Sequence, residues 1–173
     1  MQNHFELFHL PQQFALDRAA LDAAYREVQG QVHPDRFVNA TDAEKRTAMQ
    51  WATRANDAYQ TLRNPLKRAE YLCELNGYGL QAESNTAMSV EFLMQQMEWR
   101  ENLENARDTK DASALEGLSS ELRSIRNMQM ERIEQLLDAR DFAQTVQEVR
   151  QMMFVEKFGE DISFAFDALD STE

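Results

Sequence analysis

Residues 33–35 place a histidine, a proline and an aspartate in direct succession, within the stretch QVHPDRF. A histidine beside a carboxylate could serve as a general base with its orienting partner, as in hydrolases. That chemistry also needs a nucleophile held next to the base, and nothing in the sequence singles one out. We therefore expect no catalytic residues, and a protein that is not an enzyme.

The histidine could instead bind a metal ion, together with the other histidines or the single cysteine. The candidates are His4, His9, His33 and Cys73, and they show no ligand spacing. A single cysteine also excludes an internal disulfide and every multi-cysteine zinc or iron–sulfur site within the chain. The sequence therefore predicts neither a metal site nor a cofactor.

The tripeptide follows a segment that is predicted to be an amphipathic helix. Asp17 stands where an N-cap should, and Pro34 closes the helix. Because the proline ring disfavours the helical region for the preceding residue, His33 is pushed to extended geometry and Asp35 is carried into a loop. Between these ends the apolar residues have the spacing of one helical face: Leu21, Ala24, Tyr25, Val28 and Val32.

Two further helices are predicted before residue 76. Thr41 with Glu44 three residues later is a capping-box signature, and it opens a strongly periodic helix. Asn64 and Pro65 end that helix and can start another, with Asn as the cap and Pro in the first turn. The tripeptide therefore lies in the connection between two amphipathic helices.

Residues 77–88 lack periodicity and hold two of the five glycines, so we expect a linker here. Three long helical patterns follow it, near 89–107, 111–139 and 141–158 or further. Three amphipathic helices with short connections are typical of a small bundle. The expected organisation is an N-terminal domain over 1–76, a linker over 77–88 and a three-helix bundle over 89–173.

Composition predicts an all-α fold without a membrane segment. The 173 residues are 43% hydrophobic and contain only five glycines and three prolines, while residues that lose little on entering a helix are abundant. No stretch approaches the roughly 18 uncharged apolar residues that cross a bilayer. The first residues also lack the features of a signal peptide. We expect a cytoplasmic protein with no membrane association.

Charge is distributed unevenly along the chain. The formal net charge of −12 argues against nucleic acid as a ligand, because such binding depends on Lys and Arg. Residues 1–78 contain nine basic and ten acidic residues, whereas residues 79–173 contain nine basic and twenty acidic. The contrast indicates two different domains.

The first predicted helix of the second domain has two faces. At about 100° per residue, a stripe suited to a bundle core is formed by Phe92, Gln96, Trp99, Leu103 and Ala106. Leu93, Met94 and Met97 point away from it, and such a stripe commonly packs on a neighbouring helix or on another domain. Glu98 and Glu101 border the same surface, however. An apolar patch with an acidic rim has the anatomy of a binding site.

The last long helix is predicted to turn one aromatic residue outward. Its inward stripe is expected to consist of Phe142, Val146, Val149 and Met153. This arrangement leaves Phe154 on the outer surface, as a further candidate for the same binding site.

Several stretches around the tripeptide resemble a known family. The preceding helix bears Tyr25-Arg26, the following helix ends in ANDAYQTL at residues 55–62, and NPLKRAEY follows at 64–71. With the tripeptide between the helices, residues 1 to about 76 resemble the J-domain of DnaJ-class proteins.

The sequences of four stretches narrow the resemblance further. They are FELFHLP at 5–11, HPDRF at 33–37, NPLKRAEYL at 64–72 and FLM at 92–94. Together they are similar to the HscB family, the co-chaperones of iron–sulfur cluster assembly, over nearly the whole chain. The resemblance implies two partners, a DnaK-like ATPase chaperone of the HscA type and a scaffold protein of the IscU type.

The resemblance also assigns residues to each contact. The chaperone contact falls on His33, Pro34, Asp35, Arg26 and Arg36, with Asp35 pairing to a chaperone arginine and promoting ATP hydrolysis by the partner. The scaffold contact falls on Leu93, Met94, Met97, Glu98, Glu101 and Phe154. One position that is acidic in the family's motif reads Asn105 here.

Two other interpretations stay open from the sequence. A J-domain co-chaperone that serves a different client would need Asp35 but not Leu93 or Phe154. A helical adaptor with no link to a chaperone would need none of them.

Overall fold

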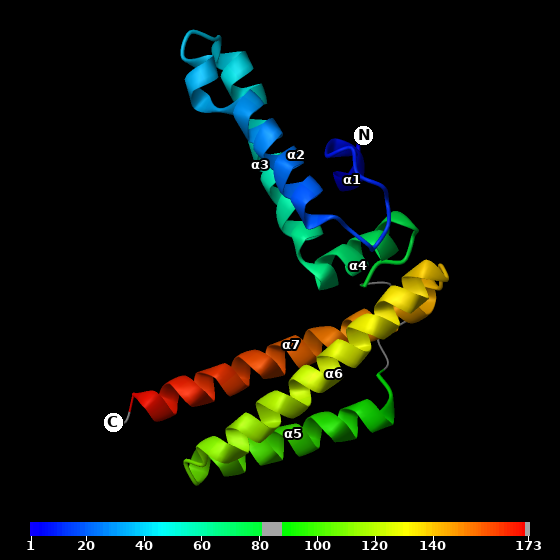
Figure 1. The fold of residues 1–173 in the computed structure, drawn as a ribbon, viewed down its shortest axis with the longest axis vertical. Helices are drawn as coiled ribbons and strands as arrows, with labels where there is room; N and C mark the ends of the chain where they lie inside the picture. Colours follow the sequence, from blue (N-terminus) through cyan, green and yellow to red (C-terminus); the bar gives the residue numbers. More distant parts are fainter. Residues whose placement is uncertain (81–87, 172–173) are drawn as a thin grey trace. The chain divides into compact units, whose positions relative to one another are not determined.

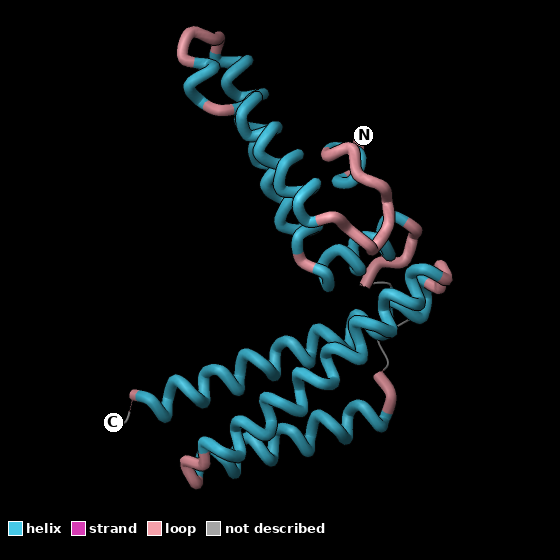
Figure 2. Tube along the Cα trace, viewed as in Figure 1, coloured by secondary structure: helices cyan, strands magenta, loops and turns pink. Residues whose placement is uncertain are grey.

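The computed structural model describes residues 1–80 and 88–171, and every regular element in these ranges is a helix (Figures 1 and 2). The expected all-α class is therefore confirmed. The elements are α1 (His4–Leu7), α2 (Arg18–Val32), the short 3-10 helix η1 (Pro34–Phe37), α3 (Asp42–Arg63), α4 (Pro65–Leu75), α5 (Val90–Asp108), α6 (Ala112–Asp138) and α7 (Phe142–Asp170).

Chain contacts separate two compact units, residues 1–75 and 76–173. Of the predicted linker 77–88, residues 81–87 lie outside the described residues. Each unit is built around its own buried apolar residues.

The first unit is a hairpin of α2 and α3, with α1 packed on α3 and α4 following it (Figure 1). The α3 face toward the core is lined with small residues, because Ala48, Ala55 and Ala58 are all buried. Helices approach more closely where the contact side chains are small. Leu21 of α2 and Phe5 of α1 are fully buried and complete this core.

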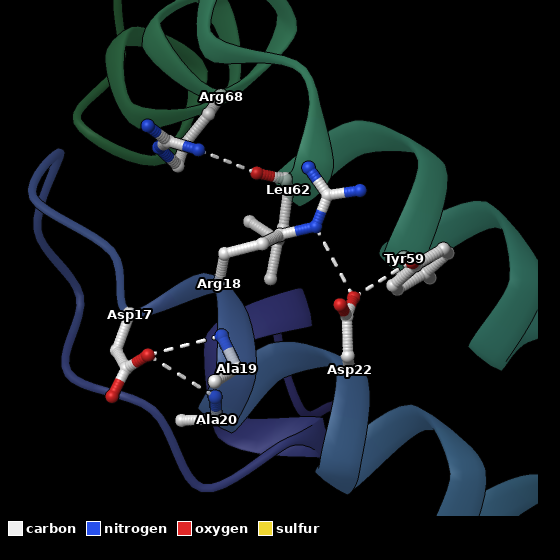
Figure 3. A network of polar contacts seen from close by, with 8 residues as sticks. All are labelled: Asp17, Arg18, Ala19, Ala20, Asp22, Tyr59, Leu62 and Arg68. Carbon is white, nitrogen blue, oxygen red and sulfur yellow. Dashed lines mark hydrogen bonds and ion pairs between the residues drawn. The ribbon is translucent and has the colours of Figure 1, made fainter.

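Helix caps occur where the sequence predicts them. The Asp17 side chain accepts hydrogen bonds from the N–H groups of Ala19 and Ala20, at 3.0 and 3.3 Å (Figure 3). Thr41 and Glu44 form the predicted capping box at the start of α3. These caps satisfy N–H groups that a helix end would otherwise leave without a partner.

A polar and aromatic cluster joins α2 to α3 near the start of α2. The Tyr25 and Tyr59 rings stack with centroids 4.1 Å apart. The Tyr59 hydroxyl donates to Asp22 Oδ1 at 2.7 Å, and Arg18 Nε lies 3.2 Å from the same oxygen (Figure 3). The hydrogen bond from Tyr59 is the main cause of a lowered pKa of the Asp22 carboxyl, with Arg18 as a second favourable cause.

The turn from α3 to α4 is fixed by a buried arginine. Arg68 Nη1 donates to the carbonyl oxygen of Leu62 at 2.7 Å (Figure 3), and its guanidinium lies 4.7 Å from the centroid of the Phe14 ring. The bond satisfies a carbonyl in the last turn of α3, and the ring contact holds the segment that precedes α2.

The second unit is a bundle of α5, α6 and α7, in which α6 and α7 pack together along much of their length (Figure 1). Ion pairs link these two helices, Arg132 with Glu148 and Arg126 with Glu156, each at 2.9 Å. Trp99 of α5 lies in the core with 2% of its surface exposed, and its ring stacks on that of Phe158 at 5.5 Å.

The predicted inward stripe of α7 is wrong at one position. Met152 is fully buried, whereas Met153 is 46% exposed. Buried residues of α7 recur at intervals of seven, at Glu148, Val155 and Ile162. Met152 lies seven residues after the buried Thr145 and fits this pattern, whereas Met153, the next residue, is turned about 100° away from it. Both residues are methionines, so apolar spacing alone did not distinguish them.

We expect Tyr59→Phe to destabilise the protein near neutral pH. The folded pKa of Asp22 is depressed, so its contribution is complete above the unfolded pKa of about 3.9 and is lost as pH falls through the folded pKa. The stability difference between variant and parent should therefore narrow in acid. Urea unfolding at pH 7 and at pH 3 measures this.

Tyr78→Phe is the control, because it removes the hydroxyl of a partly exposed tyrosine outside this cluster. A Tyr59→Phe deficit of the same size at both pH values would contradict the assignment to Asp22.

Candidate functional site

The connection between α2 and α3 has the geometry that the proline was predicted to impose. His33 has φ −59° and ψ 135°, an extended conformation at the C-terminal end of α2. The structure differs from the prediction in one respect, since Asp35 lies in the 3-10 helix η1 and not in an irregular loop. A proline at the first position of a helix is favourable because its φ is already suitable and it has no N–H group to satisfy.

The His33 side chain caps this turn. Its Nδ1 atom accepts the N–H of Asp35 at 3.2 Å, while its carbonyl oxygen accepts the N–H of Arg36 at 3.0 Å. A neutral imidazole that accepts at Nδ1 carries its proton on Nε2. His33 therefore acts on the backbone of the turn, and its ring fixes the direction in which the next residues leave α2.

The Asp35 carboxylate is left facing solvent. Its side chain is 89% exposed, and Oδ2 lies 3.5 Å from His33 Nδ1. Arg36 is exposed in the same turn, and Arg26 is exposed two turns earlier on α2. The structure thus gathers four of the five predicted chaperone-contact residues in one turn and places the fifth on the helix that leads to it.

Helix α5 has the two faces that the sequence predicts. Phe92, Trp99, Leu103 and Ala106 are buried in the bundle. The three residues predicted to point away are exposed, Leu93 by 46%, Met94 by 64% and Met97 by 70%. Packing on a neighbouring helix of the bundle, one of the two alternatives, would have buried them.

The remaining predicted scaffold-contact residues also lie on the surface. Glu98 and Glu101 are exposed on α5, and they line a shallow groove together with Met94 and Met97. Phe154 of α7 is 45% exposed. It lies one turn before Phe158, the residue whose ring stacks on Trp99 of α5.

Two exposed residues of the first turn of α5 were missed by the sequence interpretation. Val90 is 70% exposed, and Glu91 lines the same groove as Glu98 and Glu101. The exposure of Val90 could have been predicted, because it lies three residues before Leu93 and so falls on the face of Leu93, Met94 and Met97, here called the outer stripe.

Other chemistry-bearing groups form no comparable site. In the part of the chain that the structure describes, no group of three or more His, Cys, Asp or Glu side chains could hold a metal ion. Cys73 is buried, and burial raises the pKa of its thiol to about 12, so the thiolate that reacts or binds metal is disfavoured. Among the described helices, none is both long and apolar enough to cross a membrane.

A helical hairpin with an exposed His-Pro-Asp turn, followed by a three-helix bundle, is the architecture of a J-domain protein with a C-terminal helical domain. A family model described as the HSCB C-terminal oligomerisation domain matches residues 88–163. A protein of Burkholderia multivorans, called co-chaperone protein HscB homolog, is 55% identical over 169 residues, which cover 98% of this chain and 97% of the relative. The homolog of the same name in Burkholderia thailandensis is 56% identical and covers 97% and 96%.

Solved structures agree with these relatives. Chaperone HscB from Vibrio cholerae is 34% identical with a TM-score of 0.86, covering 97% of this chain and 99% of that chain. Human co-chaperone protein HscB is 27% identical with a TM-score of 0.88, covering 95% and 82%. This chain therefore belongs to the HscB family of co-chaperones.

Stability measurements should separate the two faces of α5. Trp99→Ala removes a side chain that is 98% buried and should cost about 3–5 kcal/mol in the free energy of unfolding. Met97→Ala truncates a side chain that is 70% exposed and should change it by less than about 0.5 kcal/mol. Urea unfolding of both variants tests this, and a large loss for Met97→Ala would place the outer stripe in a packed interface.

Proposed function

We propose that this co-chaperone binds an iron–sulfur scaffold protein of the IscU type, delivers it to a DnaK-like chaperone of the HscA type and stimulates that chaperone's ATPase. It would thereby assist the assembly and transfer of iron–sulfur clusters in the cytoplasm. The observation that carries the proposal is the Asp35 side chain, which is 89% exposed in a turn whose backbone is capped by His33.

The chaperone contact depends on the position of this carboxylate. An exposed carboxylate can form a short, charge-assisted hydrogen bond with an arginine of the ATPase, and such bonds are directional. The fixed conformation of His33 and Pro34 limits the directions that Asp35 can take, so less conformational entropy is lost when the pair forms. Arg26 and Arg36 would add contacts to acidic groups beside it. ATP hydrolysis then belongs to the partner.

The scaffold contact uses a different surface. Leu93, Met94 and Met97 form a flexible apolar patch, since methionine adapts its shape easily to a partner. Glu98 and Glu101 border it on α5 and suit a partner that combines apolar and basic residues. Phe154 supplies an aromatic side chain, the type that often dominates binding energy.

Joining the two contacts covalently has a physical consequence. A scaffold held on the bundle meets the chaperone at an effective concentration set by the chain, not by free diffusion. The co-chaperone can therefore promote delivery without adding contacts of its own between scaffold and chaperone.

We expect the purified protein to accelerate single-turnover ATP hydrolysis by an HscA-type chaperone, and Asp35→Asn to abolish the acceleration. The substitution keeps the shape of the side chain and removes its charge, which should reduce stimulation at least about tenfold. Asp42→Asn is the matched control, because it removes an exposed carboxylate from the start of α3. Full stimulation by Asp35→Asn would refute the proposed chaperone contact.

We also expect the double variant Leu93→Ala, Phe154→Ala to bind an IscU-type scaffold about 10- to 100-fold more weakly, because both residues would be buried by the partner. Both are nearly half exposed in the chain alone, so the free energy of unfolding should change by less than about 1 kcal/mol. Titration of labelled scaffold measures the affinity. Met128→Ala, at an exposed position on α6, is the control.

The same titration distinguishes a second function. If the parent binds no scaffold while Asp35 is still needed for ATPase stimulation, the protein is a J-domain co-chaperone for a different client. If the parent binds scaffold and the double variant keeps its affinity, the scaffold contact does not depend on Leu93 and Phe154.

A further inference from the structure

The outer stripe of α5 begins one turn earlier than the proposed scaffold contact. Val90, Leu93, Met94 and Met97 follow each other at i, i+3, i+4 and i+7, which is one continuous face of a helix. All four are exposed, and Val90 has the same exposed fraction as Met97, 70%. An apolar residue that only ended the bundle core would instead be buried with Phe92.

An acidic row runs beside this stripe and also begins in the first turn. Glu91 and Glu98 are seven residues apart, so they lie on the same side of α5, with Met94 between them. Glu91, Glu98 and Glu101 line one groove with the two methionines. Seven residues of helix span roughly 10 Å, so the row is long enough to meet more than one cation of a partner.

The acidic groups of this row are available to a partner, in contrast with others in the bundle. Glu148 and Glu156 of α7 are each paired with an arginine of α6. Within the described residues, Glu91, Glu98 and Glu101 have no ion-pair partner in the chain. A cation of a docked protein would therefore not have to displace an existing pair.

We propose that the scaffold contact extends over the first turn of α5, where Val90 and Glu91 bind an apolar side chain and a Lys or Arg of the partner. This inference rests on the proposed scaffold binding and adds two residues to it. Glu91 supplies a carboxylate at the N-terminal end of the rim, whereas the C-terminal end carries the neutral Asn105. The acidic edge of the contact is thus shifted toward the start of the helix.

Glu91 could instead serve only to stabilise the first turn of α5, and this alternative predicts a different experimental result. A carboxylate in the first turn of a helix interacts favourably with the helix dipole, and Ser89 caps the same turn through Phe92 N–H. If Glu91 served only this purpose, a Glu91 variant would melt at a lower temperature than the parent, with unchanged scaffold affinity and unchanged salt dependence. It also gives no reason for the exposed side chain of Val90.

The test is a titration of an IscU-type scaffold against full-length Glu91→Gln, Glu91→Arg and Val90→Ser, at low and high salt. Glu91→Gln should weaken binding about two- to fivefold at low salt, with a smaller effect at high salt, because one rim ion pair is lost. Charge reversal in Glu91→Arg should weaken it about tenfold or more, because a like charge then faces the cation. Val90→Ser should weaken binding about two- to tenfold at both salt concentrations.

Matched controls are Glu116→Arg on α6 and Val38→Ser, whose valine is 67% exposed in the first unit. If Glu91→Arg and Val90→Ser bind within twofold of these controls, the extension is wrong while the scaffold contact itself stands. If the parent protein binds no scaffold, the proposed function fails instead. A melting curve for each variant shows whether a weaker affinity reflects loss of folded protein.

Discussion

The proline at the end of α2 is the constraint on which the proposed chaperone contact depends. Pro34 cannot continue the helix and forces His33 into an extended conformation, which His33 then stabilises by accepting the N–H of Asp35. Without that bend, α2 would run on and Asp35 would be one of many carboxylates on a helix surface. With it, the carboxylate stands alone at the turn joining two packed helices, where the hairpin of α2 and α3 holds it in place.

The proposed scaffold contact depends in a similar way on how α5 is rotated about its own axis. Burial of Phe92 and Trp99 in the bundle fixes the orientation of α5 about its own axis. Leu93, Met94 and Met97 must then face outward, because their positions relative to those anchors are set by the backbone. Their exposure is a consequence of core packing, and the same core makes the exposed patch rigid in position while its methionines stay adaptable in shape.

Local chemistry explains which features the sequence could predict. Asp17, Thr41 and Pro34 act through their own backbone and near neighbours, so the helix limits and the bend at His33 were accessible without coordinates. The exposure of Met153 was not, because Met152 and Met153 are equally apolar and only the rotation of α7 against α6 decides which of the two is buried. Val90 and Glu91, which only the further proposal adds to the site, were not singled out for another reason, since a residue in the first turn of a helix can be assigned to a cap as easily as to a surface. The precise turn type at Asp35 also required the capping bond from His33, which sequence spacing does not reveal.

The two proposed contacts differ in how much long-range electrostatic attraction the chain can supply. Residues 1–78 are nearly neutral, so the proposed docking on the ATPase would receive little long-range attraction and would depend on one directed carboxylate pair. Residues 79–173 carry twenty acidic against nine basic groups, a field that speeds the approach of a basic partner and repels acidic ones. Because screening by salt weakens long-range attraction more than close pairs, ionic strength should act mainly on how fast the scaffold is captured. In the proposed contact the apolar residues Leu93, Met94 and Met97 would instead set the rate of release, so capture and retention of the client would depend on different residues of the second unit.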